Sequence, residues 1–135
     1  MNALQEHLQT LAEVAHEITE ANGYELLRVE NVFSCLRYAT TGCGMGDFLT
    51  AMMSNDLMET IGRADKHNAK ILPQWGRFIF NIMPNGSHGS REKVAAWRKR
   101  RQGRTKYLSV SVSHHDHNCI EVNFIEPPES QALEG

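Results

Sequence analysis

Basic side chains gather between residues 91 and 106, where their charge suits a polyanionic or acidic partner. The segment holds eight Lys or Arg residues and one acid, Glu92, so it carries +7 and leaves −9 for the rest of a chain whose net charge is −2. Its basic members are Arg91, Lys93, Arg98, Lys99, Arg100, Arg101, Arg104 and Lys106. Such a cluster can neutralise phosphates and release their counterions, and Trp97 or Tyr107 could stack on a base. An acidic protein surface would suit the same charges, and a solubilising helix face would carry them without any partner.

The run from His114 to Cys119 holds a second set of candidate ligands. On an extended strand, His115, His117 and Cys119 would share one face and could offer three ligands to a zinc ion, with Cys43 as a fourth. The spacing lacks the gap of two to four residues usual between paired zinc ligands. The competing interpretation is a polar hairpin tip. We therefore expect no metal or other cofactor, and the alternative is a small zinc-dependent enzyme.

The glycines at 42, 44 and 46 stand before an expected helix and could offer backbone amides to an anion. They match neither the P-loop pattern, which ends in Gly-Lys-Ser/Thr, nor the dinucleotide fingerprint, which follows a strand. Cys43 with His67 or His88 has no local signature of a thiol nucleophile and its base. A tight connection between helices is the favoured interpretation, and we expect the chain not to be an enzyme.

Apolar spacing predicts helices over most of residues 2–102. A stripe from Leu4 to Ile18 predicts the first, which Asn22-Gly23 ends with glycine as a C-cap, and the apolar set from Leu26 predicts a second up to about Tyr38. Asp47 is expected to cap a third helix, and Asn55 or Asp56 a fourth that runs to Ala64. The methionines at 45, 52, 53 and 58 are expected in the core, with an adaptable binding surface as the alternative.

The next segment contains a strongly apolar helix that begins near Ile71 or Leu72, because Pro73 is acceptable only in a first turn. The breakers at 83–89 end it. Ser90 is then a candidate N-cap for the basic helix, with Val94, Ala95 and Trp97 inside and the basic residues outside.

Beyond Gly103 the apolar period changes from helical to alternating. Leu108, Val110 and Val112 alternate with serines, and Ile120, Val122 and Phe124 alternate with polar residues, which predicts two half-buried strands joined through residues 114–118. Two strands alone are marginal in water, so their apolar face must lie on the helices or on another strand. We expect a hairpin over about 106–126 and a loose tail over 127–135.

Taken together, these patterns predict one α+β domain over residues 1–135, mainly helical with a C-terminal antiparallel β-hairpin. The 41% hydrophobic and 22% charged shares are those of a globular protein. The N-terminus lacks a signal-peptide core and no apolar run is long enough for a membrane span, so we expect a cytoplasmic protein with no membrane partner. Three cysteines without a CxxC pair favour reduced thiols.

Residues 46–97 resemble a group of small uncharacterised phage and prophage proteins. The resemblance rests on Gly46-Asp47-Phe48-Leu49, Asn55-Asp56-Leu57, Ala64-Asp65, Asn68, Trp75, Phe78, Asn81, Pro84, Gly89-Ser90 and Val94-Ala95-Ala96-Trp97. It covers about the middle 40% of the chain. It implies a phage setting, in which small non-enzymatic proteins often bind host machinery, and it implies no reaction and no catalytic residue.

The leading hypothesis is therefore a phage-encoded accessory or anti-defence protein. It would bind and inhibit a host protein or ribonucleoprotein complex, for example a CRISPR effector, through the basic helix and the hairpin. A direct nucleic-acid-binding regulatory module is the second hypothesis, and the zinc enzyme is the third. The hairpin could also extend a sheet in a second subunit, so a homodimer stays open.

Overall fold

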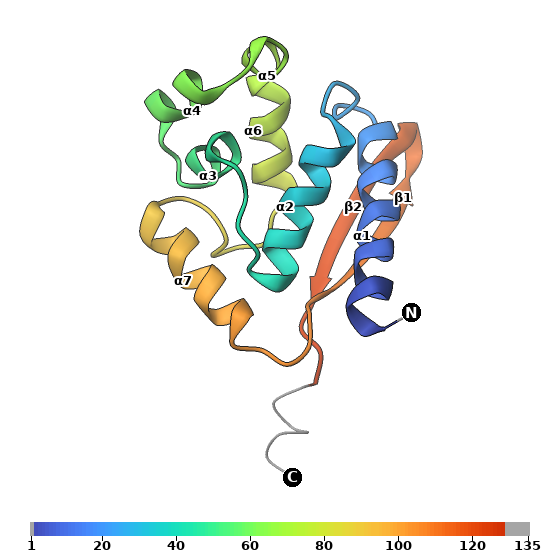
Figure 1. The fold of residues 1–135 in the computed structure, drawn as a ribbon. Coiled ribbons are helices and arrows are strands. Elements are labelled where there is room, and N and C mark those ends of the chain that lie inside the picture. Colours follow the sequence, from blue (N-terminus) through green and yellow to red (C-terminus); the bar gives the residue numbers. More distant parts are fainter. Residues whose placement is uncertain (1, 129–135) are drawn as a thin grey trace.

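The computed structural model describes residues 2–128 and, within them, seven helices followed by one hairpin (Figure 1). The helices are α1 (Ala3–Glu20), α2 (Val29–Thr41), α3 (Asp47–Met53), α4 (Leu57–Arg63), α5 (Lys66–Lys70), α6 (Leu72–Asn81) and α7 (Arg91–Gln102). The strands are β1 (Ser109–His115) and β2 (Cys119–Ile125), which pair antiparallel. The expected α+β class, mainly helical with a C-terminal hairpin, is confirmed.

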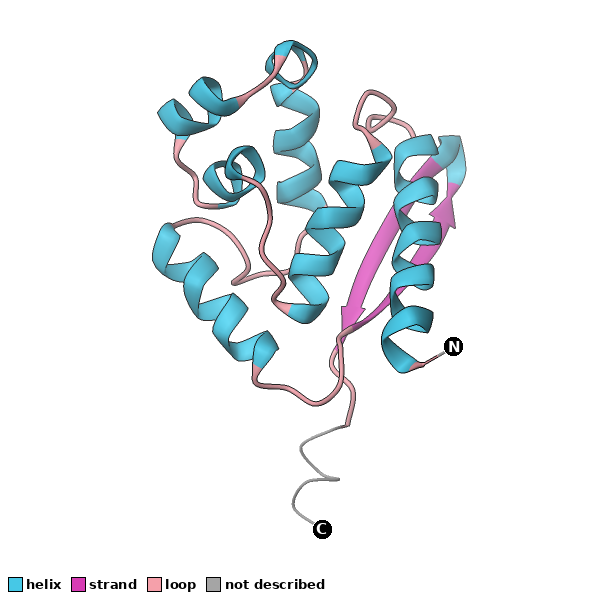
Figure 2. Ribbon diagram, in the orientation of Figure 1, coloured by secondary structure: helices cyan, strands magenta, loops and turns pink. Residues whose placement is uncertain are grey.

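Helix α2 lies in the middle of the molecule. Figure 2 shows α1 and the two strands on one side of it, with the short helices α3 to α5, helix α6 and helix α7 on the other. Helix α2 packs against both α1 and α7, and α1 also contacts β1. Helix α2 is therefore covered on both sides, and one hydrophobic core joins the helices to the hairpin.

The core is built around aromatic side chains that come from helices α2 and α6. Tyr38 of α2 and Trp75 and Phe78 of α6 are fully buried. The Trp75 indole N–H donates to the Asn68 side-chain oxygen at 3.0 Å, and the Tyr38 hydroxyl donates to the Ser87 carbonyl at 2.5 Å. Both polar groups are thus matched inside the core, as buried donors must be.

Several predicted helix ends are confirmed. The Asp56 side chain accepts from the Glu59 amide and caps α4, and the Ser90 side chain accepts from the Lys93 amide and caps α7. Pro73 lies in the first turn of α6, where its missing N–H costs nothing. These caps depend on short-range hydrogen bonds, which is why the local sequence predicts them.

Other predicted ends are wrong by one to three residues. Asp47 is the first residue of α3, and Gly46 is its N-cap. Helix α1 ends on an extended Ala21, while Gly23, with φ of 95°, serves the turn beyond it. Helix α2 begins at Val29, because residues 24–27 form turns held by backbone hydrogen bonds such as Leu27 to Tyr24. The short helix α5 was not predicted, since five residues carry too little apolar periodicity.

The hairpin follows its predicted alternation. Val110 pairs with Phe124 and Val112 with Val122, and this face packs against the core. Strand β1 continues through His115, so the turn is shorter than expected and consists of Asp116–Asn118. The predicted tail lies outside the described residues from residue 129 on. Within residues 2–128, no helix combines the length and the apolar character needed to cross a membrane.

Candidate functional site

Helix α7 presents the basic segment on a firmly anchored support. Val94, Trp97 and Arg101 face the core, and the Trp97 indole N–H donates to the Ala39 carbonyl of α2 at 3.0 Å. The expectation for the inner face was partly wrong, because Ala95 is exposed and Arg101 is only 3% exposed. Arg101 follows Val94 and Trp97 on the core-facing side of α7, whereas the sequence predicts all basic residues on the outer side.

Part of the basic charge is neutralised within the protein. Arg91 pairs with Asp56 at 2.9 Å, and Arg101 donates to both oxygens of Glu126 at 2.9 and 3.1 Å. Arg104 lies 3.9 Å from the same carboxylate. These arginines therefore hold α7 to α4 and to the residues after β2, and they contribute less to an outward field than the segment's +7 suggests.

Arg98 is also used internally. Its Nε donates to the Gly42 carbonyl at 3.1 Å, and the Gln102 side chain donates to the same oxygen at 2.9 Å. Together these bonds join α7 to the end of α2. The glycine-rich stretch is thus a tight connection between helices, as the sequence favoured, and Arg98 lies against it.

Lys93, Lys99 and Arg100 are exposed cations of α7. Among residues 2–128, no carboxylate lies within ion-pair distance of these three. Lys93 and Arg100 are seven residues apart and share one side of the helix, whereas Lys99 lies about 100° from Arg100. The Arg100 guanidinium also lies over the Trp97 ring, 4.7 Å from its centroid.

The two rings offered for base stacking are already engaged. Trp97 is 6% exposed and lies in the core. Tyr107 stacks on His7 with the ring centroids 4.7 Å apart. Trp97 therefore leaves little surface for a base, and His7 occupies one face of the partly buried Tyr107, so stacking on a base by either ring stays a prediction.

The histidine-rich run does not form a ligand set. His117 has φ of 63° inside the turn, so strand alternation does not bring it to the face of His115 and Cys119. His115 instead lies 3.4 Å from Glu121, and Cys43 follows α2 at the end near α7, away from the hairpin tip (Figure 1). Within the described residues, no three His, Cys, Asp or Glu side chains come close enough to hold a metal ion.

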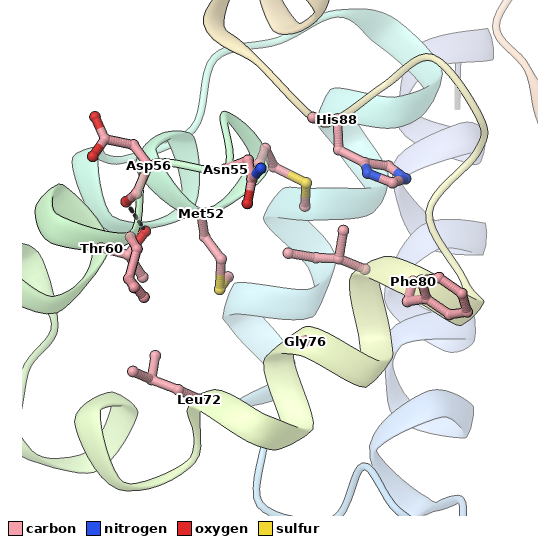
Figure 3. A pocket seen from close by; sticks show the side chains of 12 residues that line it. Met52, Asn55, Asp56, Thr60, Leu72, Gly76, Phe80 and His88 are labelled. Atoms are coloured by element: carbon pink, nitrogen blue, oxygen red, sulfur yellow. Dashed lines mark hydrogen bonds between the residues drawn. The ribbon is translucent and has the colours of Figure 1, made fainter.

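A hollow between α3, α4 and α6 is the feature that sequence reasoning missed. Figure 3 shows Met52 and Leu72 turned toward it, with Phe80 and His88 at one end and Asp56 and Thr60 at the other. Its volume is about 420 Å³. Its full lining is Met52, Met53, Asn55, Asp56, Leu57, Thr60, Leu72, Gly76, Ile79, Phe80, His88 and Gly89. The lining thus consists mainly of apolar side chains with a few polar ones, among them Asn55, Asp56, Thr60 and His88.

Large apolar side chains stand exposed at this hollow and on α4, the helix that contributes Leu57 and Thr60 to its lining. Phe80 is 85% exposed and Leu57 66%, and both line it, while Met58 and Ile61 on α4 are 76% and 52% exposed. We define these four residues as the apolar rim. Met53 is buried as expected, but Met58 is not. Among residues 2–128 no side chain covers Met58, which only the tertiary structure shows.

Charged groups border the apolar rim. The hydrogen bond from Arg91 holds the pKa of Asp56 below its usual value, and the bond from the Glu59 amide adds to this. Burial lowers the pKa of His88, and the nearby Lys93 ammonium lowers it further. The apolar rim is therefore bordered by Asp56, whose carboxylate is paired with Arg91, by His88, whose pKa is lowered, and by the positively charged Lys93.

Comparison with known proteins identifies no relative. No family model, no curated protein and no solved structure matches the chain. The candidate site is therefore described by its own geometry, which combines an apolar hollow, four exposed apolar side chains and the adjacent cations of α7.

Proposed function

We propose that this chain is a binding protein whose contact surface is the apolar rim and its hollow, extended by Lys93 and Arg100 of α7. The observation that carries the proposal is Phe80, which is 85% exposed at the edge of a 420 Å³ hollow. Large apolar side chains left exposed at a hollow on a folded protein mark surfaces that bind other molecules. The exposed Phe80 ring and Met58 thioether suit an apolar anchor of a partner protein.

The flanking charges favour an acidic border on that partner. Lys93 lies beside His88 at the hollow's edge and meets no carboxylate among the described residues. Asp56, the acid at the rim, is already paired with Arg91. A partner surface with an apolar anchor and nearby carboxylates would therefore be complementary in both shape and charge.

The resemblance of residues 46–97 to phage and prophage proteins supports a role in infection. In this proposal the chain is an accessory or anti-defence protein that inhibits a host complex by covering one of its surfaces, for example an acidic or nucleic-acid-associated surface of a CRISPR effector. The hairpin contributes less than expected, because its apolar face packs against the chain's own core. The proposal requires no bond-making step.

The test compares Phe80→Asp with Leu26→Asp in infected cells that carry a nucleic-acid-directed defence system. Leu26 is also more than half exposed but does not line the hollow, so it is a matched control. We expect the wild-type chain and Leu26→Asp to restore phage plating, and Phe80→Asp to lose that effect. Full activity of Phe80→Asp would contradict the proposed surface.

A second measurement separates protein contact from direct nucleic-acid binding. Purified chain is titrated with duplex and single-stranded DNA and RNA at low salt, using the wild type, Phe80→Asp and the triple variant Lys93→Glu, Lys99→Glu, Arg100→Glu. Under the proposed function, we expect neither DNA nor RNA to bind the purified chain measurably at physiological salt. Tight, salt-dependent binding that only the triple variant abolishes would favour the nucleic-acid module instead.

A further inference from the structure

A second hollow lies where the C-terminal half of α7 meets the end of the hairpin. Its volume is about 380 Å³. Three guanidinium groups line it, those of Arg100, Arg101 and Arg104, and the carboxylate among its lining residues is that of Glu126. The rest of its wall is apolar and consists of Pro84, Trp97, Leu108 and Phe124. The lining thus combines an excess of positive charge with an apolar side.

Arg101 is the buried member of this set. It is 3% exposed, and its Nη2 donates to both oxygens of Glu126. Its Nε and Nη1 are buried and have no hydrogen-bond partner among residues 2–128. The Trp97 ring, 5.7 Å from the guanidinium, offers only its face. Unmatched donors on a buried charged group are costly, so they point to an acceptor that residues 2–128 do not supply.

The single carboxylate of Glu126 does not neutralise the three arginines that line this hollow. Its side chain is 47% exposed, and it is shared between Arg101 at 2.9 Å and Arg104 at 3.9 Å. Arg100 lies over Trp97 and has no carboxylate within ion-pair distance among the described residues. One carboxylate therefore faces three arginines, which leaves room for a further anion.

We propose that this hollow binds a phosphate group. A phosphate has more negative charge and more acceptor oxygens than a carboxylate, and arginine forks match its geometry. The apolar wall provides a place for an organic part of the ligand, beside the charged groups. This site shares Arg100 with the contact surface proposed above but contains none of the four residues of the apolar rim, so the inference does not depend on the proposed function.

The experiment titrates isotopically labelled chain at low salt with inorganic phosphate, with a nucleoside monophosphate and with the same nucleoside lacking its phosphate. The Arg101 Nε–H and Trp97 Nε1–H resonances report on the hollow directly. We expect both phosphates to shift them and the free nucleoside to leave them unchanged. If the monophosphate binds about tenfold tighter or more, the source is an organic phosphate, and equal affinities indicate free phosphate.

Variants test the charge balance without touching the buried arginine. Arg100→Gln and Arg104→Gln should each weaken phosphate binding about tenfold, whereas Glu126→Gln should strengthen it because a competing carboxylate charge is removed. Lys99→Gln removes the same charge from α7 outside the hollow and is the matched control. The site is overturned if phosphate produces no shifts, if the free nucleoside binds equally well, or if Lys99→Gln weakens binding as much as Arg100→Gln.

Discussion

Gly42 lies so close to Arg98 that a Cβ at this position would stand 2.6 Å from the Arg98 carbonyl oxygen. Gly42 caps α2 in the left-handed conformation, with φ of 78°, and its own carbonyl accepts from the Arg98 and Gln102 side chains. The approach of α7 to the end of α2 thus depends on a residue without a side chain. It also positions α7, which contributes Lys93 and Arg100 to the first proposed surface and the arginines of the second hollow.

Substitution of Gly42 by Ala should therefore lower the free energy of unfolding by about 2 kcal/mol or more. The left-handed backbone alone costs about 1–2 kcal/mol for a residue with a Cβ, and the backbone contact adds to it. Urea unfolding followed by circular dichroism measures the change. Gly62→Ala, in α4 with nothing within 4 Å of its Cβ position, should instead be neutral or stabilise by up to about 1 kcal/mol. Equal effects of the two substitutions would argue against the close approach.

Two phenylalanines of α6 should differ strongly in how much their substitution by alanine destabilises the fold. Phe78 is fully buried in the aromatic core, so Phe78→Ala should lower the free energy of unfolding by about 3–5 kcal/mol. Phe80 projects to solvent, so Phe80→Ala should change it by less than about 0.5 kcal/mol. Thermal and urea unfolding of both variants measures the contrast. A large loss for Phe80→Ala would mean that its ring belongs to the core.

Acidification should weaken the fold before the carboxylates titrate. Burial lowers the pKa of both His7 and His88 below 6.5, and Lys93 adds to the effect at His88. As the pH falls through 6.5, both imidazoles become protonated in the unfolded chain. In the folded protein they stay neutral until the pH reaches their lower native pKa values. Stability should therefore decrease from about pH 6.5 downward.

The measurement is urea unfolding between pH 7.5 and 5 for the wild type and for the double variant His7→Gln, His88→Gln. The double variant should show a shallower decrease over this range. The carboxyls of Asp56 and Asp65, whose pKa values are lowered from 3.8 by their hydrogen bonds and arginine partners, lose their contribution only at lower pH. An unchanged slope in the double variant would contradict the assignment to these two imidazoles.

The three cysteines should differ in reactivity because the fold treats them differently. Cys35 is fully buried, and burial raises the pKa of its thiol well above the usual range. Cys119 is exposed on the hairpin, and Cys43 is half-buried. A thiol reagent should label Cys119 first in the native protein and Cys35 only on unfolding. Mass spectrometry of peptides after timed labelling measures the order, and early labelling of Cys35 would contradict the packing of α2.

The local sequence predicted those features that depend on neighbours along the chain. The caps at Asp56 and Ser90, the first-turn position of Pro73 and the alternation of the hairpin need only short-range hydrogen bonds or a period of two or 3.6 residues. The same information predicted the α+β class. Helix α5 was missed because five residues carry too little periodicity.

Tertiary packing decided which of the predicted side chains reach solvent. Arg101 is buried because the core-facing stripe of α7 extends to it. The Trp97 indole N–H bonds to the Ala39 carbonyl and the Tyr107 ring stacks on His7, and both partners lie far away in the sequence. Leu57, Met58 and Ile61 of α4 stay exposed because no other element in the described part of the chain covers them. Residue types alone determined that the chain has a basic segment and enough apolar surface for a core. Only the meeting of distant elements decided where charge is neutralised and where an apolar surface stays uncovered, because burial depends on contacts between elements and not on spacing within one.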